Sequence, residues 1–525
     1  MSDEPSAWRQ GIWWDAAAIA LVACTASVLL AAPLFPSQDG PVHLYYVDVL
    51  RGLLTHAGPY SQHFEIKTFV TPYALEYYSL LALEMVFSPA VSEKLLVGCY
   101  IFAFGLGFRY LVESVAERRS PWTLAGIPFC MHRLVYLGFL NYCFGVALLL
   151  FLCGFWIRFS GRLNPGRVAA LLAGLASMLL THPVPVAVFL LFIGLDFVTD
   201  LVRDAAAGRR RWAPGLRDRR RPLALMAVMA AMALVWVGMF VDRSQPAPSS
   251  PSYVSVYGWG RTLAGELELL PVAPFTSLAY RAGPLLLLGI AVLTVLQSSW
   301  RQAGRLCSAA VALIATSSIC FALYGIVPPR INGSWYFAER FPILWALFLL
   351  AAAAALRPPR WWSVATGAIA LCVTAGVLLP QWGLVSRIAT RIAPALDCPP
   401  AQAGSVGLIV GPPKALPEGL AFDPYLWSAA HYFRRSGAIL ANAPWMDLPI
   451  LMMRPAHPSR WSYLDPDDAA QAMADAMAGG QALPDLDFVV REGPADFEMD
   501  AMLNRMGWSN STGNSEFLRV FRRHR

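Results

Sequence analysis

The chain has 525 residues, of which 57% are hydrophobic and 14% are charged, and its mean hydropathy is +0.49. Soluble globular domains carry roughly 25% charged residues, so this composition excludes a soluble globule and indicates a polytopic membrane protein. The formal net charge of +7 does not predict nucleic acid as a partner, because the arginines gather in short loops between apolar segments, as the positive-inside rule requires.

The cysteines predict neither a disulfide framework nor a metal site. Most of them lie inside apolar segments, Cys398 falls in the polar C-terminal part, and no Cys-x-x-Cys pair occurs. The first apolar segment lacks a small-x-small cleavage site before Asp39, so we expect it to remain as an anchor rather than be removed as a signal peptide.

The first apolar segment, Ala16 to Phe35, is roughly 20 residues long and can cross a bilayer. Asp39 follows where the chain leaves the hydrocarbon, and an ionisable group there is a functional candidate. If a helix begins near Pro41, Asp39 and His43 share a face of its first turn and can share a proton or a metal. Asp39 can equally cap that helix, and His43 can equally bond to a backbone carbonyl.

Ten further apolar segments are predicted to span the membrane. If the Arg-rich stretch Arg203 to Arg221 lies inside, the Arg clusters fall on one side, provided that the aromatic segment Tyr73 to Phe87 does not cross. This gives about eleven spans, a cytoplasmic N-terminus and an outer C-terminus. The ten segments are Val91–Val112, Trp122–Tyr136, Tyr142–Trp156, Val168–Leu180, Pro185–Leu201, Leu223–Val241, Pro284–Val295, Ala309–Ile326, Phe341–Leu356 and Trp362–Leu379.

The C-terminal part differs in composition and predicts a small α/β domain outside the membrane. We therefore predict a transmembrane domain over 1–380, with a first outer loop at 37–90, and an extracytoplasmic domain over 381–525. The acids of the second domain lie in cap and turn contexts, so we expect it to shape acceptor access rather than carry chemistry. Its predicted elements are strands at Val406–Val410, Leu486–Val490 and Phe517–Phe521, and helices at Asp423–Arg435, Pro466–Met477 and Ala495–Met506.

This order of segments resembles the GT-C superfamily of membrane glycosyltransferases, which includes protein mannosyltransferases and lipid A aminoarabinose transferases. Asp39-Gly40-Pro41-x-His43 resembles the acidic motif of their first outer loop. Pro72-Tyr73-x-x-x-Tyr77-Tyr78 looks like their juxtamembrane helix, which does not cross, and Phe87-Ser88-Pro89-x-x-x-Glu93-Lys94 looks like the segment that opens their next span. The usual acid pair is reduced to Asp39 and the second proline of the juxtamembrane motif is absent, so the chain is identified as a diverged member.

The resemblance implies an integral membrane glycosyltransferase of the bacterial inner membrane. It would move a sugar from a polyprenyl-phosphate donor to a lipid, glycan or protein acceptor at the outer face, among membrane lipids. Asp39 would take the acceptor proton as base beside His43, and positive charge would hold the leaving phosphate. Glu76 or Glu339 would supply a second acid. A divalent metal is a possible cofactor, and the oligomeric state is not indicated.

The loop from Pro328 to Phe341 is the second informative stretch. Arg330 and Arg340 lie on the predicted outer face, where the positive-inside rule disfavours them, so an anionic partner is expected. That partner can be the phosphate of a lipid carrier, a phospholipid headgroup or Glu339. Trp335 and Tyr336 can contact substrate or serve as ordinary interfacial aromatics.

Other polar residues fall on the same predicted face. His182 precedes the helix-breaking Pro183 and can face a cavity or close a capped turn. Arg133 lies in another polar break and can line that cavity or extend to the headgroups. The predicted substrate-binding residues are Glu76, Tyr77, His182, Arg330, Trp335, Tyr336, Glu339 and Arg340.

A non-catalytic transporter or lipid-binding scaffold is the alternative. Transporters show internal repeats and paired interrupted helices, and this sequence shows no such symmetry. Its polar residues gather on one predicted face rather than at mid-membrane, which favours the enzyme.

Overall fold

The computed structural model describes fifteen stretches of the chain, and the structural statements below concern these residues alone. They are 4–206, 220–241, 278–301, 307–327, 336–392, 399–411, 426–442, 453–455, 461–462, 464, 466–478, 486–492, 497–505, 508–510 and 518–523.

The chain divides into two compact units. The bundle unit comprises Met1–Val28, Val97–Leu134 and Leu140–Pro380, and the loop unit comprises Leu29–Leu96, Val135–Phe139 and Gln381–Arg525. The loop unit thus joins the segment 37–90, which is predicted as the first outer loop, to the C-terminal segment. The predicted domain boundaries, 1–380 and 381–525, stay a prediction.

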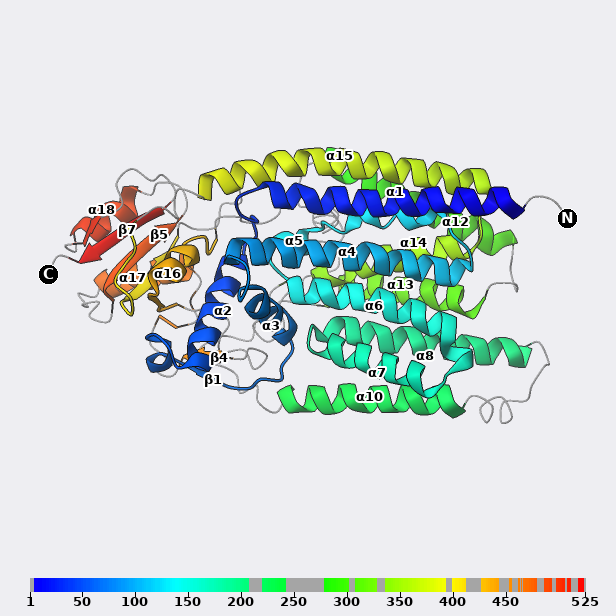
Figure 1. The fold of residues 1–525 in the computed structure, drawn as a ribbon, viewed down its shortest axis with the longest axis horizontal. Helices are drawn as coiled ribbons and strands as arrows, with labels where there is room; N and C mark the ends of the chain where they lie inside the picture. The colour runs from blue at the N-terminus through cyan, green and yellow to red at the C-terminus, as the bar shows by residue number, and fades with distance from the viewer. Residues whose placement is uncertain are drawn as a thin grey trace. The chain divides into compact units, whose positions relative to one another are not determined.

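Long apolar helices build the bundle unit and lie side by side with nearly parallel axes (Figure 1). Within the described residues, eight helices are long and apolar enough to cross a membrane, and shorter apolar helical segments cover Trp13–Ser27 and Pro165–Leu179. The chain is therefore an integral membrane protein, while the count of about eleven spans stays a prediction. The helices are α1 Glu4–Ala31, α4 Pro89–Ala116, α6 Leu140–Phe159, α7 Pro165–Leu179, α8 Pro183–Ala206, α10 Arg220–Val241, α12 Leu278–Arg301, α13 Ser308–Ile326, α14 Phe341–Ala355 and α15 Arg360–Ile392.

One predicted spanning helix is wrong. Trp122–Tyr136 forms the short 3-10 turns η2 (Pro121–Leu124) and η3 (Ile127–Phe129) and the one-turn helix α5 (Arg133–Tyr136). Gly126 and Pro128 interrupt the helical pattern, because proline removes a backbone donor and glycine disfavours the helix interior.

The irregular segment nevertheless runs back along α4. Gly126 lies against the Phe108 ring, and nearer the start of α4 the Tyr100 hydroxyl donates to the Cys130 carbonyl over 2.9 Å. Residues 122–138 are buried throughout. Non-helical backbone is tolerated at membrane depth where protein surrounds it, which explains how this segment can replace a helix.

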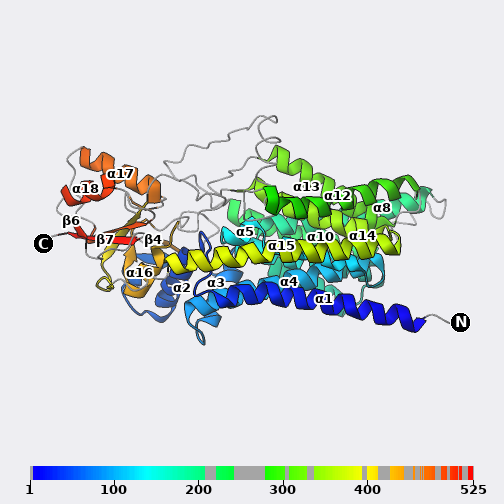
Figure 2. The ribbon, with the colours of Figure 1, turned by 90° about the horizontal axis from the view of Figure 1, so that it is seen from above.

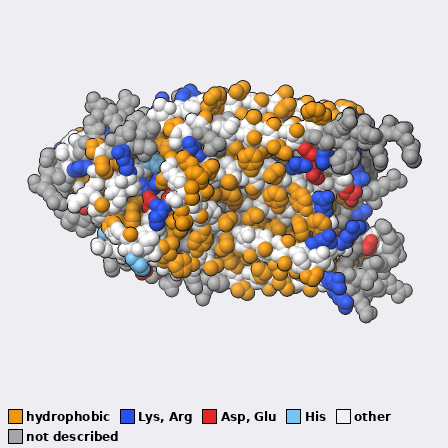
Figure 3. Space-filling model, viewed as in Figure 1, with side chains coloured by type: hydrophobic (Ala, Val, Ile, Leu, Met, Phe, Trp, Pro, Cys, Tyr) orange, Lys and Arg blue, Asp and Glu red, His pale blue; other side chains and the backbone are white. Residues whose placement is uncertain are grey.

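Lys and Arg side chains gather over one end of the bundle, beyond a broad hydrophobic band (Figure 3). Among the arginines of this unit, Arg109 and Arg119 pair with Asp15 over 3.1 and 3.0 Å, and Arg357 pairs with Glu117 over 2.5 Å. Arg357, just after α14, thus meets Glu117, just after α4, so these two helices end side by side. The side of the membrane that this end faces stays a prediction.

The first outer loop belongs to the loop unit and contains two helices. α2 covers Gly40–Thr55 and α3 covers Ala74–Leu83, with the 3-10 turn η1 (Tyr60–Gln62) and the strand β1 (Phe64–Ile66) between them. At about 1.5 Å per residue, the ten-residue α3 is about 15 Å long and too short to cross a bilayer. The prediction that Tyr73–Phe87 does not cross as a helix is confirmed.

The C-terminal segment forms a five-stranded sheet in the order β3-β2-β5-β7-β6. β2 pairs in parallel with β3 and β5, whereas β7 is antiparallel to β5 and β6. α17 and α18 cover one face of the sheet and α16 the other (Figure 2). The elements are β2 Val406–Val410, α16 Ala430–Ser436, β3 Ile439–Leu440, α17 Pro466–Ala478, β5 Phe488–Glu492, α18 Phe497–Arg505, β6 Trp508–Asn510 and β7 Leu518–Arg523.

Alternation along the strands builds a core on each face of the sheet. Leu408, Val489 and Phe521 pack in one buried cluster with Met473 of α17 and Leu503 of α18. On the other face, the rings of Tyr432 and Phe433 on α16 contact Phe488 with centroids 5.9 and 5.2 Å apart. The predicted strand at Val406–Val410 is confirmed to the residue, and those at Leu486–Val490 and Phe517–Phe521 to within two residues at each end.

The predicted helix at Asp423–Arg435 is too long at its start. Within the described residues, α16 begins at Ala430 after a turn in which Trp427 has a φ of +65°. Residues 423–425 lie outside the described residues. The short strand β4 (Met453–Pro455), which pairs antiparallel with β1 of the first outer loop, was not predicted.

Candidate functional site

Asp39 stands at the N-cap of α2 without using its side chain as the cap. Its carboxylate accepts no hydrogen bond from the first turn, and Pro41 occupies one of the first helical positions. The side chain is only 3% exposed, and Gln38 Nε2 donates to its Oδ1 over 3.3 Å. The helix therefore does not need the carboxylate for capping, which favours the chemical role over the structural one.

A turn after α5 braces the backbone of Asp39. The Gln38 amide donates to the Tyr136 carbonyl over 2.8 Å and the Asp39 amide to the Leu137 carbonyl over 3.3 Å. Gly138 follows with a φ of +87°, where a side chain would be strained. These contacts fix the position at which the carboxylate leaves the chain.

His43 and Tyr77 meet beside Asp39. His43 Nδ1 and the Tyr77 hydroxyl share a hydrogen bond of 3.0 Å, and burial lowers the pKa of His43 to about 4. Burial raises the pKa of Tyr77 well above its ordinary value, and electrostatic interactions with Glu76, Tyr73 and Asp39 raise it further. At neutral pH this site therefore combines a neutral imidazole with a protonated phenol, and Tyr77 can donate to Nδ1.

The structure brings together the four predicted residues Asp39, His43, Glu76 and Tyr77. α3 begins after Tyr73, whose φ of +72° turns the chain into the helix. Glu76 and Tyr77 lie in its first turn, and both are buried. Carboxylates are seldom fully buried unless they are paired or functional, so the cluster is a candidate site.

A further carboxylate, Glu93, lies beside the start of α2. Ser37 Oγ donates to Glu93 Oε1 over 2.9 Å, and a β-carbon added at Gly40 would come within 2.1 Å of the same oxygen. The sequence places Glu93 in a motif without predicting its proximity to Asp39. The contact joins residues 56 positions apart, and no local pattern could have shown it.

The bundle unit holds a second cluster, which contains two buried arginines. The Arg133 guanidinium carbon lies 5.0 Å from the centre of the Tyr336 ring, and that of Arg340 lies 5.2 Å from the centre of the Phe337 ring. Arg133 is 5% exposed, and its Nε and Nη1 have no hydrogen-bond partner. Arg133 thus does not extend to the surface of the protein, and two of its nitrogens remain available to an anion.

His182 belongs to the same cluster through Tyr142. The Tyr142 ring stands edge-on to the His182 ring at 5.3 Å, and the Tyr142 hydroxyl donates to the Arg340 carbonyl. His182 Nδ1 accepts a hydrogen bond from the Val184 amide over 3.1 Å, at the start of α8. This is the capped turn that the sequence allowed, so His182 has a structural role whether or not it also contacts substrate.

The remaining predicted residues lie beside Arg340 or outside the described part of the chain. Tyr336, with a φ of +58°, and Glu339, in the 3-10 turn η5 (Ala338–Arg340), lie in the bundle unit beside Arg340. Arg330 and Trp335 lie outside the described residues. The predicted residues thus fall into a loop-unit cluster around Asp39 and a bundle-unit cluster around Arg340.

Metal binding is not decided by these clusters. Among the residues that the structure describes, no group of three or more His, Cys, Asp or Glu side chains is arranged to hold a metal ion. A divalent metal therefore stays an untested possibility.

Comparisons with known proteins give distant structural similarity and no sequence family. No protein-family model and no curated protein matches the chain. The oligosaccharyltransferase of Archaeoglobus fulgidus in its apo form is similar with a TM-score of 0.48 and 11% identity, over 93% of this chain and 70% of that one. The same enzyme, tethered by a disulfide bond to an acceptor peptide with the NVT sequon, is similar with a TM-score of 0.45 and 11% identity. This match covers 91% of this chain and 69% of that one. Similarity this distant carries no functional argument, so the function has to be inferred from the residues of this chain.

Proposed function

We propose that this protein is a membrane glycosyltransferase that moves a sugar from a polyprenyl-phosphate donor to an acceptor hydroxyl, with Asp39 as the general base. The observation that carries this proposal is the buried Asp39 carboxylate, which α2 positions without using it as a cap. The motif resemblance around Asp39 and the aromatic helix α3 supports the same chemistry. A bacterial inner membrane, with the loop unit outside, is the proposed location.

The reaction needs one proton acceptor and one cationic group. Asp39 takes the proton of the acceptor hydroxyl as the acceptor oxygen forms its bond to the anomeric carbon. The bond between that carbon and the phosphate oxygen breaks, and the phosphate leaves with the electron pair. Positive charge is required where this charge develops.

The loop-unit cluster suits the role of base. His43 is neutral at physiological pH because burial lowers its pKa to about 4, so it adds no positive charge that would make Asp39 a weaker base. Tyr77 stays protonated and can donate to His43 or to a sugar hydroxyl. We therefore assign His43, Tyr77 and Glu76 to positioning and substrate contact around Asp39.

The bundle-unit cluster suits the role of phosphate contact. Arginine presents a rigid fork of donors that matches phosphate, and Arg133 keeps two of its nitrogens without a protein partner. Arg340 lies in the same cluster, stacked on Phe337. As a separate feature of the bundle unit, Arg133 and Arg340 form an anion-binding cluster beside Tyr336 that suits the phosphate of a lipid carrier.

The decisive experiment replaces the base. Asp39→Asn keeps the shape of the side chain and removes its basicity, so we expect transfer from polyprenyl-phosphate sugars to fall by about 10²- to 10⁴-fold. Donor binding and thermal stability should change little. Glu65→Gln, which neutralises an exposed carboxylate on β1 of the same unit, is the matched control. Full activity of Asp39→Asn would refute Asp39 as the base, and no transfer by the native protein with any donor of this class would favour a non-catalytic scaffold.

A further inference from the structure

We infer that Arg434, on α16 of the C-terminal segment, is a positioning residue for the site around Asp39, acting through a chain of ion pairs along α2. This inference rests on the proposed function for its kinetic consequence, whereas its structural part stands independently. All of the groups concerned lie in the loop unit.

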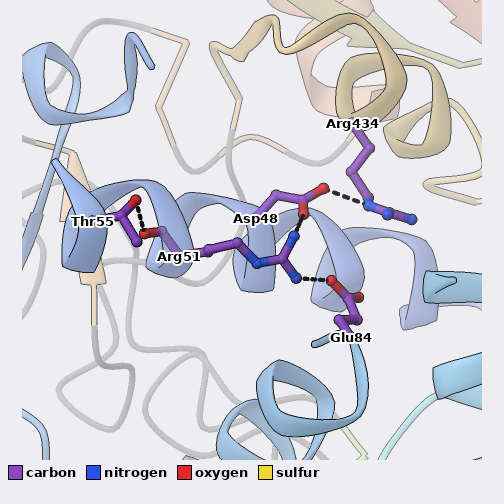
Figure 4. A network of polar contacts seen from close by, with 5 residues as sticks. All are labelled: Asp48, Arg51, Thr55, Glu84 and Arg434. Atoms are coloured by element: carbon purple, nitrogen blue, oxygen red, sulfur yellow. Dashed lines mark hydrogen bonds and ion pairs between the residues drawn. The ribbon is translucent and has the colours of Figure 1, made fainter. Parts of the chain in front are cut away.

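Four charged side chains form the chain of ion pairs (Figure 4). Arg434 Nε lies 2.5 Å from Asp48 Oδ2, and Asp48 Oδ1 lies 3.2 Å from Arg51 Nη1. Arg51 in turn pairs through Nη2 with Glu84, at the end of α3. The charges alternate in sign, so each carboxylate and each guanidinium has an opposite neighbour, and α16, α2 and α3 are joined in one series.

The chain gives α2 and α3 a second point of attachment. His43 contacts Tyr77 near the start of the two helices, and Arg51 contacts Glu84 near their ends. The first pair and the second are separated by eight residues on α2, which is about 12 Å of helix, and by seven on α3, which is about 10 Å. Two contacts about two turns apart fix both the separation and the direction of the helices that carry Asp39 and Glu76.

The C-terminal segment holds the opposite face of α2. Tyr45, about 200° around the helix from His43, accepts a hydrogen bond from the Leu440 amide over 2.9 Å and donates to the Ala438 carbonyl over 3.4 Å. β3 is an edge strand of the five-stranded sheet, so the Tyr45 hydroxyl satisfies edge groups that have no neighbouring strand. Tyr45 and Asp48 are three residues apart on one face, which makes α16 and β3 a single docking surface for α2.

Burial makes the Arg434–Asp48 pair more than a surface contact, whereas the Arg51 side chain between Asp48 and Glu84 is 40% exposed. The Asp48 and Arg434 side chains are each 16% exposed, and the Glu84 side chain is 1% exposed. Removing one partner of a largely buried pair leaves the other charge poorly compensated. Loss of Arg434 should therefore loosen α2 rather than simply delete one contact.

The test compares Arg434→Gln with two other variants in the full-length protein. Arg435→Gln changes the adjacent, exposed arginine of α16 and is the control, whereas Arg434→Lys keeps the charge and is the conservative rescue. Hydrogen–deuterium exchange of the α2 amides measures how often this helix opens, without any substrate. Transfer kinetics then measure kcat and the KM for the donor separately.

We expect Arg434→Gln to speed amide exchange in α2 by about tenfold and to lower kcat by about 10- to 100-fold, since a small misplacement can cost that much. The donor KM should stay within about twofold, and Arg434→Lys should recover most of both effects. Unchanged exchange in α2 would overturn the inference whatever the activity. Faster exchange with a native kcat would reduce Arg434 to a structural residue. If the native protein has no transfer activity, the proposed function fails, and the exchange result still decides the docking of α2.

Discussion

Gly138 lies so close to Asp39 that a β-carbon added to the glycine would stand 3.0 Å from the Asp39 β-carbon. The same atom would stand 3.0 Å from the Gly40 amide nitrogen, and the φ of Gly138 is +87°. The turn that braces Asp39 therefore tolerates only glycine at this position, for reasons of both space and backbone conformation.

The first prediction concerns Gly138→Ala. The added methyl must displace Asp39 or the start of α2, so we expect transfer activity to fall by about 10- to 100-fold and stability to fall by about 1–3 kcal/mol. Activity assays and thermal unfolding of the purified protein measure the two effects. Gly161→Ala is the control, because a β-carbon there meets no atom within 4 Å. Native activity in Gly138→Ala would mean that the placement of Asp39 is not critical.

Local sequence patterns predicted several elements of the loop unit. The apolar run Val406–Val410 gave a strand, and the Pro-led aromatic segment gave the short helix α3. The spacing of Asp39 and His43 indicated the first turn of α2, and the His43 amide indeed donates to the Asp39 carbonyl over 3.1 Å. These features depend on neighbours within a few residues, where periodicity and turn chemistry carry the information.

Long-range pairing could not be predicted in the same way. Tyr45 bonds to Leu440, and β1 pairs with β4, across nearly four hundred residues. The Arg434–Asp48 pair also spans 386 positions. The apolar segment Trp122–Tyr136 was predicted as a spanning helix because hydropathy records burial but not backbone conformation. The expectation that the C-terminal domain shapes acceptor access stays a prediction, and its contacts with α2 indicate a second role, which is to hold that helix in place.

The second prediction concerns pH. Burial lowers the pKa of His43 to about 4, below the ordinary 6.5 that the unfolded chain would show. Between these values the unfolded state binds more protons than the folded state, so stability rises with pH in this window. The contribution of the neutral His43 imidazole to the free energy of unfolding is complete above about pH 6.5 and is lost as the pH falls towards 4. It amounts to about 3 kcal/mol.

Thermal unfolding of the native protein from pH 4 to pH 8 measures this dependence. His43→Gln should weaken it but not abolish it, because burial and then the charge of Arg434 lower the pKa of His431 to about 3 in the same unit. His43→Gln together with His431→Gln should flatten the profile further. A native pH profile in both variants would show that neither imidazole is buried as described.

The third prediction concerns the orientation in the membrane. The proposal places the loop unit outside, and positions chosen for labelling must be exposed to solvent. In a variant with Cys398→Ser, cysteines at Ser61 or Gln402 should react with an impermeant thiol reagent added to intact cells, and a cysteine at Gly161 should not. All three positions are exposed. Labelling of Gly161→Cys with protection of the other two would reverse the assigned orientation.

The last prediction concerns Arg133, for which the effects on stability and on binding should separate. Leaving buried guanidinium nitrogens without partners costs about 1–3 kcal/mol. Stacking on Tyr336 offsets about 1–2 kcal/mol of that cost. Replacing Arg133 with methionine removes both the cost of the unpaired nitrogens and the stabilisation by stacking. The thermal midpoint of the free protein should therefore change by only a few degrees.

Donor binding should respond differently, because a charge-assisted hydrogen bond to phosphate is made only in the complex. We expect Arg133→Met to weaken binding of a polyprenyl-phosphate sugar by about tenfold or more, as one lost contact of about 1.5–3 kcal/mol implies. Arg167→Met is the control, since that guanidinium also lies over a ring, Phe159, at 4.4 Å, but donates to the Arg162 carbonyl at an exposed site. Titration of the purified protein with the donor, and with an ordinary anionic phospholipid as competitor, measures the effect. Equal affinity of the native and Arg133→Met proteins for the donor would remove the phosphate from this cluster, and weakened phospholipid binding alone would assign Arg133 to a structural lipid instead.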